Sequence, residues 1–221
     1  MNHSDILSGI LTGFTSSLIF NPLDKIIYIS TTKNISITDK RIYSNLFQGS
    51  LNTLLTRIIT SGIYFSMIDS SSHKMNPMQL SLLGASICSL TNPLQLIKFN
   101  SWYNNISMNG SYKMIMNRFG IRGLFIGTPA IFTRDLIFNY IYISNKKSGE
   151  HLHNIGIISM ALMISSPINL IKNKKYGNFE DIRTIIKNFN YKQLGIGKNI
   201  IRSSLCFYFN QFLYDNLKTY L

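Results

Sequence analysis

Three arginines lie inside stretches of otherwise apolar sequence, where a charged side chain needs a physical reason. They are Arg57, Arg134 and Arg202. A charge at the centre of a membrane-spanning helix costs about 2.5–3.5 kcal/mol on insertion scales. A guanidinium group recognises carboxylate and phosphate oxygens through paired hydrogen bonds. The three arginines therefore predict a water-filled cavity that binds anionic groups. The alternative is that each side chain extends to a helix end.

The spacing of the arginines from a preceding glycine is regular in two of the three places. Arg134 and Arg202 each follow a glycine by seven residues, whereas Arg57 follows its glycine by eight. One residue turns a helical side chain by about 100°. Arg57 is therefore the least well aligned of the three.

An acidic residue directly follows one of these arginines, in the pair Arg134-Asp135. Such a pair suits a zwitterion, because the guanidinium binds a carboxylate and the Asp binds an ammonium group. The alternative is an ion pair within the helices that does not touch a substrate.

Three prolines divide the chain into similar units. Pro22, Pro93 and Pro167 each lie late in an apolar stretch, at spacings of 71 and then 74 residues. A fixed period indicates a repeated architecture. A proline in an apolar helix kinks it and frees a carbonyl group, which neighbouring helices or a wet cavity must satisfy. The predicted units are 1–74, 75–149 and 150–221.

Each unit contains two apolar segments long enough to cross a bilayer, which needs about 20 residues. The six segments are 6–29, 48–68, 78–99, 127–144, 153–171 and 197–217. Each also carries polar residues, which favours a bundle around a wet interior. We therefore predict an all-α membrane protein with six transmembrane helices, arranged as three pseudosymmetric two-helix repeats around a central cavity.

Basic residues are concentrated in the loops inside the units. The loops 30–47, 100–126 and 172–196 hold twelve Lys or Arg residues, and the loops between units hold three. Basic loops stay on the side of the membrane that is not translocated. We therefore expect the long loops on one face and both termini on the other.

Composition supports a membrane protein rather than a soluble enzyme. Charged residues make up 14% of the chain, below the roughly 25% of a typical soluble domain. The net charge is +13, but basic residues are not interleaved with exposed aromatics, so no nucleic-acid partner is expected. Cys88 and Cys206 lie in apolar stretches, which argues against a disulfide framework. The sequence contains no catalytic triad, phosphate loop or metal-ligand spacing. We therefore predict no enzyme activity, no bound metal and no cofactor.

Two further motifs carry a resemblance to a known family. The run from Gly120 to Pro129, GIRGLFIGTP, leads into Thr133-Arg134-Asp135, and Tyr214-Asp215-Asn216-Leu217-Lys218 ends the last apolar segment. Together with the three proline motifs, these sequences resemble the mitochondrial carrier family over essentially the whole chain. The resemblance implies alternating access, exchange of solutes across the mitochondrial inner membrane, and termini on the intermembrane-space side. It also implies a monomer in contact with the bilayer and with an anionic lipid such as cardiolipin.

The resemblance further assigns roles to polar residues near the prolines. Arg57, Arg134-Asp135 and Arg202 would contact the substrate. Asp24 would pair with Lys98, and Gln95 would hydrogen-bond Lys172, to close the matrix side of the cavity. The alternative for these residues is a solvated helix end.

Two positions leave the expected gates incomplete. Asn169 faces Ile27, where the family has a basic residue. At the opposite mouth, Asp69 and the pair Asp215 and Lys218 fit the family's second network, but the middle unit offers Lys146-Lys147 in place of an acid. Substrate binding can shift the equilibrium between two conformations only by its difference in affinity for them. A carrier therefore needs two gates of similar, modest strength, and two weak gates meet this condition.

The function expected from the sequence is transport of a small anionic or zwitterionic metabolite, with an amino-acid-like substrate favoured by Arg134-Asp135. A nucleotide or deoxynucleotide is the alternative substrate class. A further alternative is a degenerate carrier that does not transport and serves as a membrane scaffold. A soluble nucleic-acid-binding protein is the remaining, remote alternative.

Overall fold

The computed structural model describes residues 3–71, 75–147 and 150–220, and their side chains except at 3–6, 61–71, 151, 192 and 218–220. These residues form helices and no strand. The α-helices are α1 (His3–Thr32), α2 (Ser50–Ser71), α3 (Pro77–Leu90), α4 (Asn92–Asn104), α5 (Met108–Phe119), α6 (Thr128–Asn145), α7 (His151–Asn178), α8 (Ile182–Lys187) and α9 (Ile196–Tyr220). Short 3-10 helices are η1 (Lys40–Tyr43), η2 (Ile121–Phe125) and η3 (Tyr191–Leu194).

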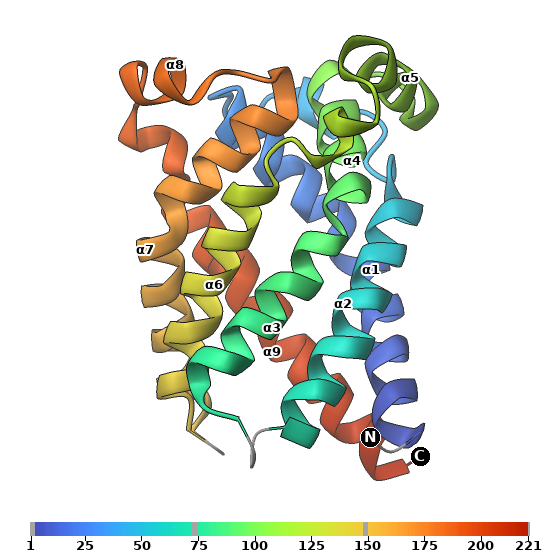
Figure 1. Ribbon diagram of the computed structural model, residues 1–221, viewed down its shortest axis with the longest axis vertical. Coiled ribbons are helices and arrows are strands. Elements are labelled where there is room, and N and C mark those ends of the chain that lie inside the picture. The colour runs from blue at the N-terminus through green and yellow to red at the C-terminus, as the bar shows by residue number, and fades with distance from the viewer. Residues whose placement is uncertain (1–2, 72–74, 148–149, 221) are drawn as a thin grey trace.

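The long helices form a closed ring (Figure 1). Neighbours contact one another in the order α1, α2, the pair α3 and α4, α6, α7, α9, and α9 returns to α1. Each of the six predicted apolar segments corresponds to one member of this ring. The all-helical prediction is therefore confirmed for the described residues.

Length and composition identify few membrane spans among the described residues. One helical stretch, Leu152–Asn178, is long and apolar enough to cross a membrane by itself. The pair α3 and α4 also qualifies if its two parts count as one bent span. The crossing of a membrane by all six members of the ring stays a prediction.

The ring helices carry polar residues on a buried face, as α1 shows. Its inward face buries Ser8, Thr12 and Ser16, whereas Leu11 and Leu18 are exposed on its outer face. Large apolar residues are also exposed on α2, α3, α7 and α9: Leu51, Leu55, Leu82, Leu90, Met160, Met163, Ile164, Ile201, Leu205 and Phe212. The bundle thus buries many polar side chains alongside apolar ones and exposes many large apolar side chains on its outside.

The three prolines occupy two kinds of position. Pro22 lies inside α1 and Pro167 inside α7, and both helices continue through them. Pro93 lies in the first turn of α4, next to a 55° bend between α3 and α4 at Thr91. Proline is tolerated in the first turn because its missing N–H has no partner there.

The second long helix of each unit starts from a glycine with a left-handed backbone. Gly49, Gly127 and Gly195 have φ of 76°, 86° and 55° and directly precede α2, α6 and α9. A Cβ atom at Gly127 would lie 2.7 Å from the ring of Tyr176, and one at Gly195 would clash with Thr31. Each glycine therefore packs closely against the first long helix of the next unit, in cyclic order.

In two units, the asparagine that precedes the proline connects the first long helix to the loop within the same unit. Asn21 donates a hydrogen bond to the Leu46 carbonyl, at 3.2 Å, and Asn92 donates to the Leu124 carbonyl, at 2.8 Å. The third unit has Ser166 at this position, which bonds within α7 instead. These contacts give the Asn-Pro motif a structural role that sequence reasoning had not assigned.

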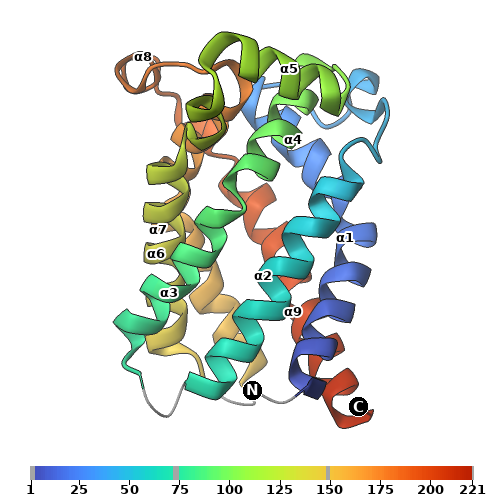
Figure 2. The same cartoon turned by 45° about the vertical axis from the view of Figure 1, so that its right-hand side comes forward.

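The two ends of the ring differ (Figures 1 and 2). The short helices α5 and α8 lie at one end, and the start of α1 and the end of α9 lie at the other. This matches the predicted grouping of the long loops opposite the termini. Two of the predicted unit boundaries, at 74 and 149, fall outside the described residues, so the division into units stays a prediction.

Candidate functional site

The ring encloses a cavity of about 370 Å³, lined by α1, α2, α4, α6, α7 and α9. Every one of these helices contributes at least one charged side chain to the lining. The sequence-predicted residues that line it are Asp24, Arg57, Gln95, Lys98, Arg134, Asp135, Asn169, Lys172 and Arg202. The expected substrate contacts and the expected matrix-side gate therefore belong to one site.

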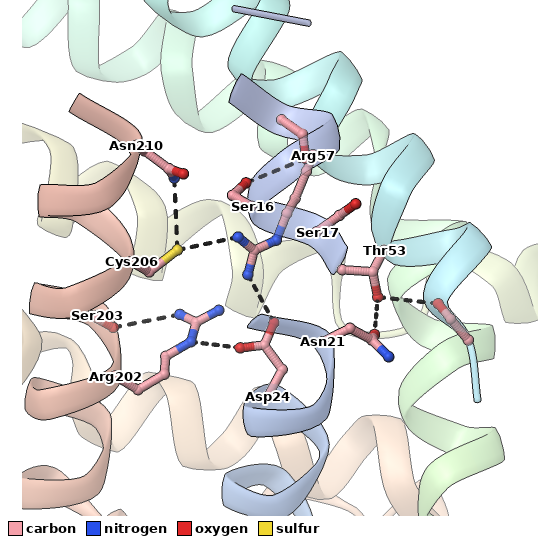
Figure 3. Close-up of polar contacts among 12 residues, drawn as sticks. Ser16, Ser17, Asn21, Asp24, Thr53, Arg57, Arg202, Ser203, Cys206 and Asn210 are labelled. Carbon is pink, nitrogen blue, oxygen red and sulfur yellow. Dashed lines mark hydrogen bonds and ion pairs between the residues drawn. The ribbon is translucent and has the colours of Figure 1, made fainter. Parts of the chain in front are cut away.

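Asp24 joins two of the three arginines (Figure 3). Arg57 Nη2 donates to its Oδ2 at 3.0 Å, and Arg202 Nε donates to its Oδ1 at 2.6 Å. These bonds connect α1 to α2 and α9, its two neighbours in the ring. Arg57 thus reaches the site despite its different spacing from glycine.

The structure contains no ion pair between Asp24 and Lys98, so their expected gate pairing stays a prediction. Both oxygens of Asp24 already accept a hydrogen bond from an arginine. The physical reason is the ring order, because α1 packs against α2 and α9 on either side and their guanidinium groups reach its inward face.

The side chains of Arg134 and Asp135 are hydrogen-bonded to each other. Arg134 donates from Nε, at 2.7 Å, and from Nη2 to Asp135 Oδ1. The other oxygen of Asp135 is buried and has no hydrogen-bond partner among the described residues. The structure thus contains the ion pair within one helix that was the alternative to a zwitterion clamp.

Gln95 and Asn169 each make one hydrogen bond that the sequence did not predict. Gln95 Nε2 donates to Thr91 Oγ1 one turn earlier, at 3.0 Å, and the structure shows no hydrogen bond between Gln95 and Lys172. Asn169 Oδ1 accepts from Arg134 Nη1 at 3.4 Å, which connects α7 to α6.

Lys98 and Lys172 are buried, with exposed fractions of 5% and 4%, and neither makes an ion pair with a described residue. Their ammonium groups lie near aromatic rings instead. Lys98 Nζ is 4.7 Å from the Phe99 ring centroid, and Lys172 Nζ is 5.3 Å from the same centroid.

Four aromatic side chains, Tyr28, Phe99, Trp102 and Tyr176, form a cluster beside the two lysines of the expected ionic gate. The Phe99 centroid lies 4.5 Å from Tyr28, 5.2 Å from Trp102 and 5.7 Å from Tyr176. The Tyr28 hydroxyl also donates to the Asn173 carbonyl at 3.3 Å. These contacts join α1, α4 and α7, so packed rings connect the first long helices of the three units.

Sequence reasoning missed one polar residue of the cavity, Cys206, and one buried lysine outside its lining, Lys25. Cys206 lines the cavity, and its Sγ accepts from Arg57 Nη1 at 3.1 Å. Its position one turn after Arg202 on the same helix is the signal that could have found it. Lys25 is 1% exposed, and its Nζ donates to the Ser44 and Asn45 carbonyls and to Gln48 Oε1, at 2.8–2.9 Å.

The network expected at the opposite mouth stays a prediction. The side chains of Asp69 and Lys218 lie outside the described residues. Asp215 is exposed on α9, near the end of the ring that carries the termini.

Comparison with known proteins gives one informative similarity. No family model matches the chain. Part of the chain is similar to a carrier. It is 29% identical over 109 residues to the mitochondrial substrate carrier family protein X of Dictyostelium discoideum, covering 41% of this chain and 36% of that protein. The match spans well under half of the relative's length, and it supports a carrier-type protein without naming a substrate.

Proposed function

We propose that this chain is a carrier-type membrane transporter that binds small anionic solutes in the cavity of the helical ring. The observation that carries the proposal is the convergence of Arg57, Arg134 and Arg202, from three different helices, on one cavity. The exposed apolar surface of the ring supports a position in a lipid bilayer. Similarity to a carrier protein supports the same class and favours a mitochondrial membrane.

Asp24 gives the proposed transporter a way to couple binding to movement. Its carboxylate binds two of the arginines. A solute carboxylate or phosphate competes for Arg57 and Arg202, and its binding releases α1 from α2 and α9. Such competition gives the solute a different affinity for the tied and released arrangements, as a conformational shift requires. Exchange across the inner membrane by alternating access is the form of transport that we propose.

The substrate class follows from which cationic groups are available. An amino acid would use the pair Arg134 and Asp135 only after these residues separate, since they are bonded to each other. An anion needs no such separation to reach the ammonium groups of Lys98 and Lys172. We therefore place anionic solutes ahead of zwitterions.

A carrier that no longer transports is the second candidate function. It is favoured by the lack of an Asp24–Lys98 ion pair and by the packing of the Tyr28 ring against the Phe99 ring. In this case the ring would act as a membrane scaffold.

Uptake of labelled solutes into liposomes containing the purified protein tests the proposal. We expect saturable uptake of an anion, reduced about tenfold or more in Arg202→Ala, because a hydrogen bond to a charged group contributes about 1.5–3 kcal/mol. The matched control is Arg122→Ala, at an exposed arginine of η2. A folded protein that takes up no anion, nucleotide or amino acid would favour the scaffold.

A further inference from the structure

We propose that Lys98 and Lys172 form an oxyanion-binding subsite for a solute with at least two negative charges, such as a polycarboxylate or a phosphate compound. The subsite lies where Tyr28 and Phe99 line the cavity, next to the ring of Trp102. This inference rests on the proposed solute-binding role of the cavity, and it gives the two lysines a role other than a gate.

Both lysines place an ammonium group at the cavity with no carboxylate within ion-pair distance among the described residues. Each is at least nine-tenths buried and lines the cavity, and neither has a carboxylate partner among the described residues. The aromatic faces attract the ammonium groups through their quadrupoles. A quadrupole supplies neither a negative charge nor a strong hydrogen-bond acceptor, so both groups can still bind an anion.

The net charge of the cavity lining also favours an anionic solute. Five basic and two acidic side chains surround the cavity, a formal excess of three positive charges. Asp24 is fully engaged by Arg57 and Arg202, and Asp135 is engaged by Arg134. Both carboxylates are already paired with arginines, so two of the three excess charges fall on the lysines and one stays on the cluster of Asp24, Arg57 and Arg202. A zwitterion brings no net charge and leaves this excess in place, whereas a polyanion removes most of it.

Lys25 shows how this chain satisfies a buried lysine that has a structural role. Its ammonium group donates three hydrogen bonds of 2.8–2.9 Å to two carbonyls and an amide oxygen. Lys98 and Lys172 lie in the same bundle at similar burial, but no described residue accepts a hydrogen bond from them. Instead, their ammonium groups share the ring of Phe99. The difference indicates that their acceptor comes from outside the chain.

The size of the cavity restricts the occupant. Its volume of about 370 Å³ is near the lower limit of small-molecule sites. A compact polyanion can place one charged group between the lysines and another toward Arg57 and Arg202, where it competes with Asp24. Citrate, inorganic pyrophosphate and ADP represent the carboxylate and phosphate sources of this chemistry.

Trp102 provides a direct reporter for the test. It is the one tryptophan of the chain, and its ring centroid lies 4.9 Å from Lys98 Nζ. The purified full chain is titrated with citrate, pyrophosphate and ADP, with alanine as the zwitterion and sodium chloride at matched ionic strength. We expect a saturable change of tryptophan fluorescence with at least one polyanion and none with alanine or chloride.

The variants Lys98→Met and Lys172→Met should each weaken polyanion binding about tenfold or more, since each removes a charged hydrogen-bond donor. Lys98→Arg should retain binding. The matched control is Lys113→Met, at an exposed lysine of α5, which changes the net charge equally outside the cavity. Equal polyanion affinity in the wild type and both Met variants would overturn the subsite.

Thermal unfolding without ligand separates a binding role from a structural one. Removing an unbalanced buried charge should raise Tm in Lys172→Met, whereas Lys25→Met should lower it because three acceptors lose their donor. A fall of Tm in both lysine variants of the cavity, with polyanion affinity unchanged, would mean a structural role. If Lys98→Met fails to fold, Lys172→Met alone decides.

The same preparation distinguishes this inference from the proposed transport function. Polyanion binding without uptake into liposomes would overturn transport and leave the subsite standing. Uptake of alanine without polyanion binding would support transport and overturn the subsite.

Discussion

At the scale of single residues, the site depends on which acid each base binds. Asp24 has a side chain only 9% exposed, and its two arginines are 12% and 30% exposed. An ion pair at this depth is shielded from solvent, so its loss has a larger effect than that of a surface pair. The single carboxylate therefore controls two of the three arginines of the cavity.

The substitution Asp24→Asn should destabilise the ligand-free protein and strengthen anion binding. Removing one partner of a buried ion pair typically costs about 3–5 kcal/mol, because the other charge stays buried without compensation. An anion then no longer competes with a carboxylate for Arg57 and Arg202. Thermal unfolding and the tryptophan titration measure the two effects.

The control for this change is Asp181→Asn, at the exposed N-cap of α8. Asn caps a helix as well as Asp does, so Tm should be unchanged. Weaker anion binding in Asp24→Asn would show that Asp24 is not a competitor of the solute.

At the scale of the elements, the ring depends on close contacts between neighbouring helices. A Cβ atom at Gly13 of α1 would lie 2.7 Å from the backbone oxygen of Arg57 on α2. Glycine at this position allows the two backbones to approach, as small residues do between membrane helices. The same contact fixes the start of the Arg57 side chain relative to Asp24.

The substitution Gly13→Ala should therefore push α1 away from α2. We expect a loss of about 1–3 kcal/mol of stability, the usual cost of overpacking, and weaker solute binding through displaced Arg57. Thermal unfolding and the fluorescence titration detect these changes.

Gly156 provides the matched position, since a Cβ atom there would meet nothing within 4 Å. Gly156→Ala should leave stability unchanged or raise it by about 1 kcal/mol through helix propensity. A larger loss in Gly156→Ala than in Gly13→Ala would contradict the packing argument.

At the scale of the whole molecule, the exposed apolar surface and the two different ends define how the ring would sit in a membrane. The short helices α5 and α8 share one end, and the start of α1 and the end of α9 share the other. The long loops at the end with α5 and α8 hold twelve basic residues. This favours placing the end with α5 and α8 on the side of the membrane that is not translocated.

Site-specific labelling in sealed vesicles tests this arrangement. With Cys88 and Cys206 changed to Ser, a polar thiol reagent should reach Lys113→Cys and Lys187→Cys from the same side, because both positions lie in the loop-side helices α5 and α8. Tags on the two termini should be accessible from the other side. Release of the protein by carbonate extraction would overturn the membrane position altogether.

The sequence by itself determined the helices and the residues that meet in the cavity. Apolar segments of sufficient length, separated by basic loops, specify six helical members of the ring, and inward-facing polar residues repeat along them. Arg57, Arg134 and Arg202 were identified because a charge in an apolar stretch is costly. These properties are local, so they can be read from spacing and residue type.

Only the tertiary structure decided which charged groups pair. Arg202 and Asp24 are 178 positions apart in the chain, and their contact follows from the closure of the ring between α9 and α1. That closure assigned Asp24 to two arginines and left Lys98 and Lys172 beside the ring of Phe99. Partner choice depends on distances of a few ångströms between separate helices, because Coulomb attraction and hydrogen bonding act over that range.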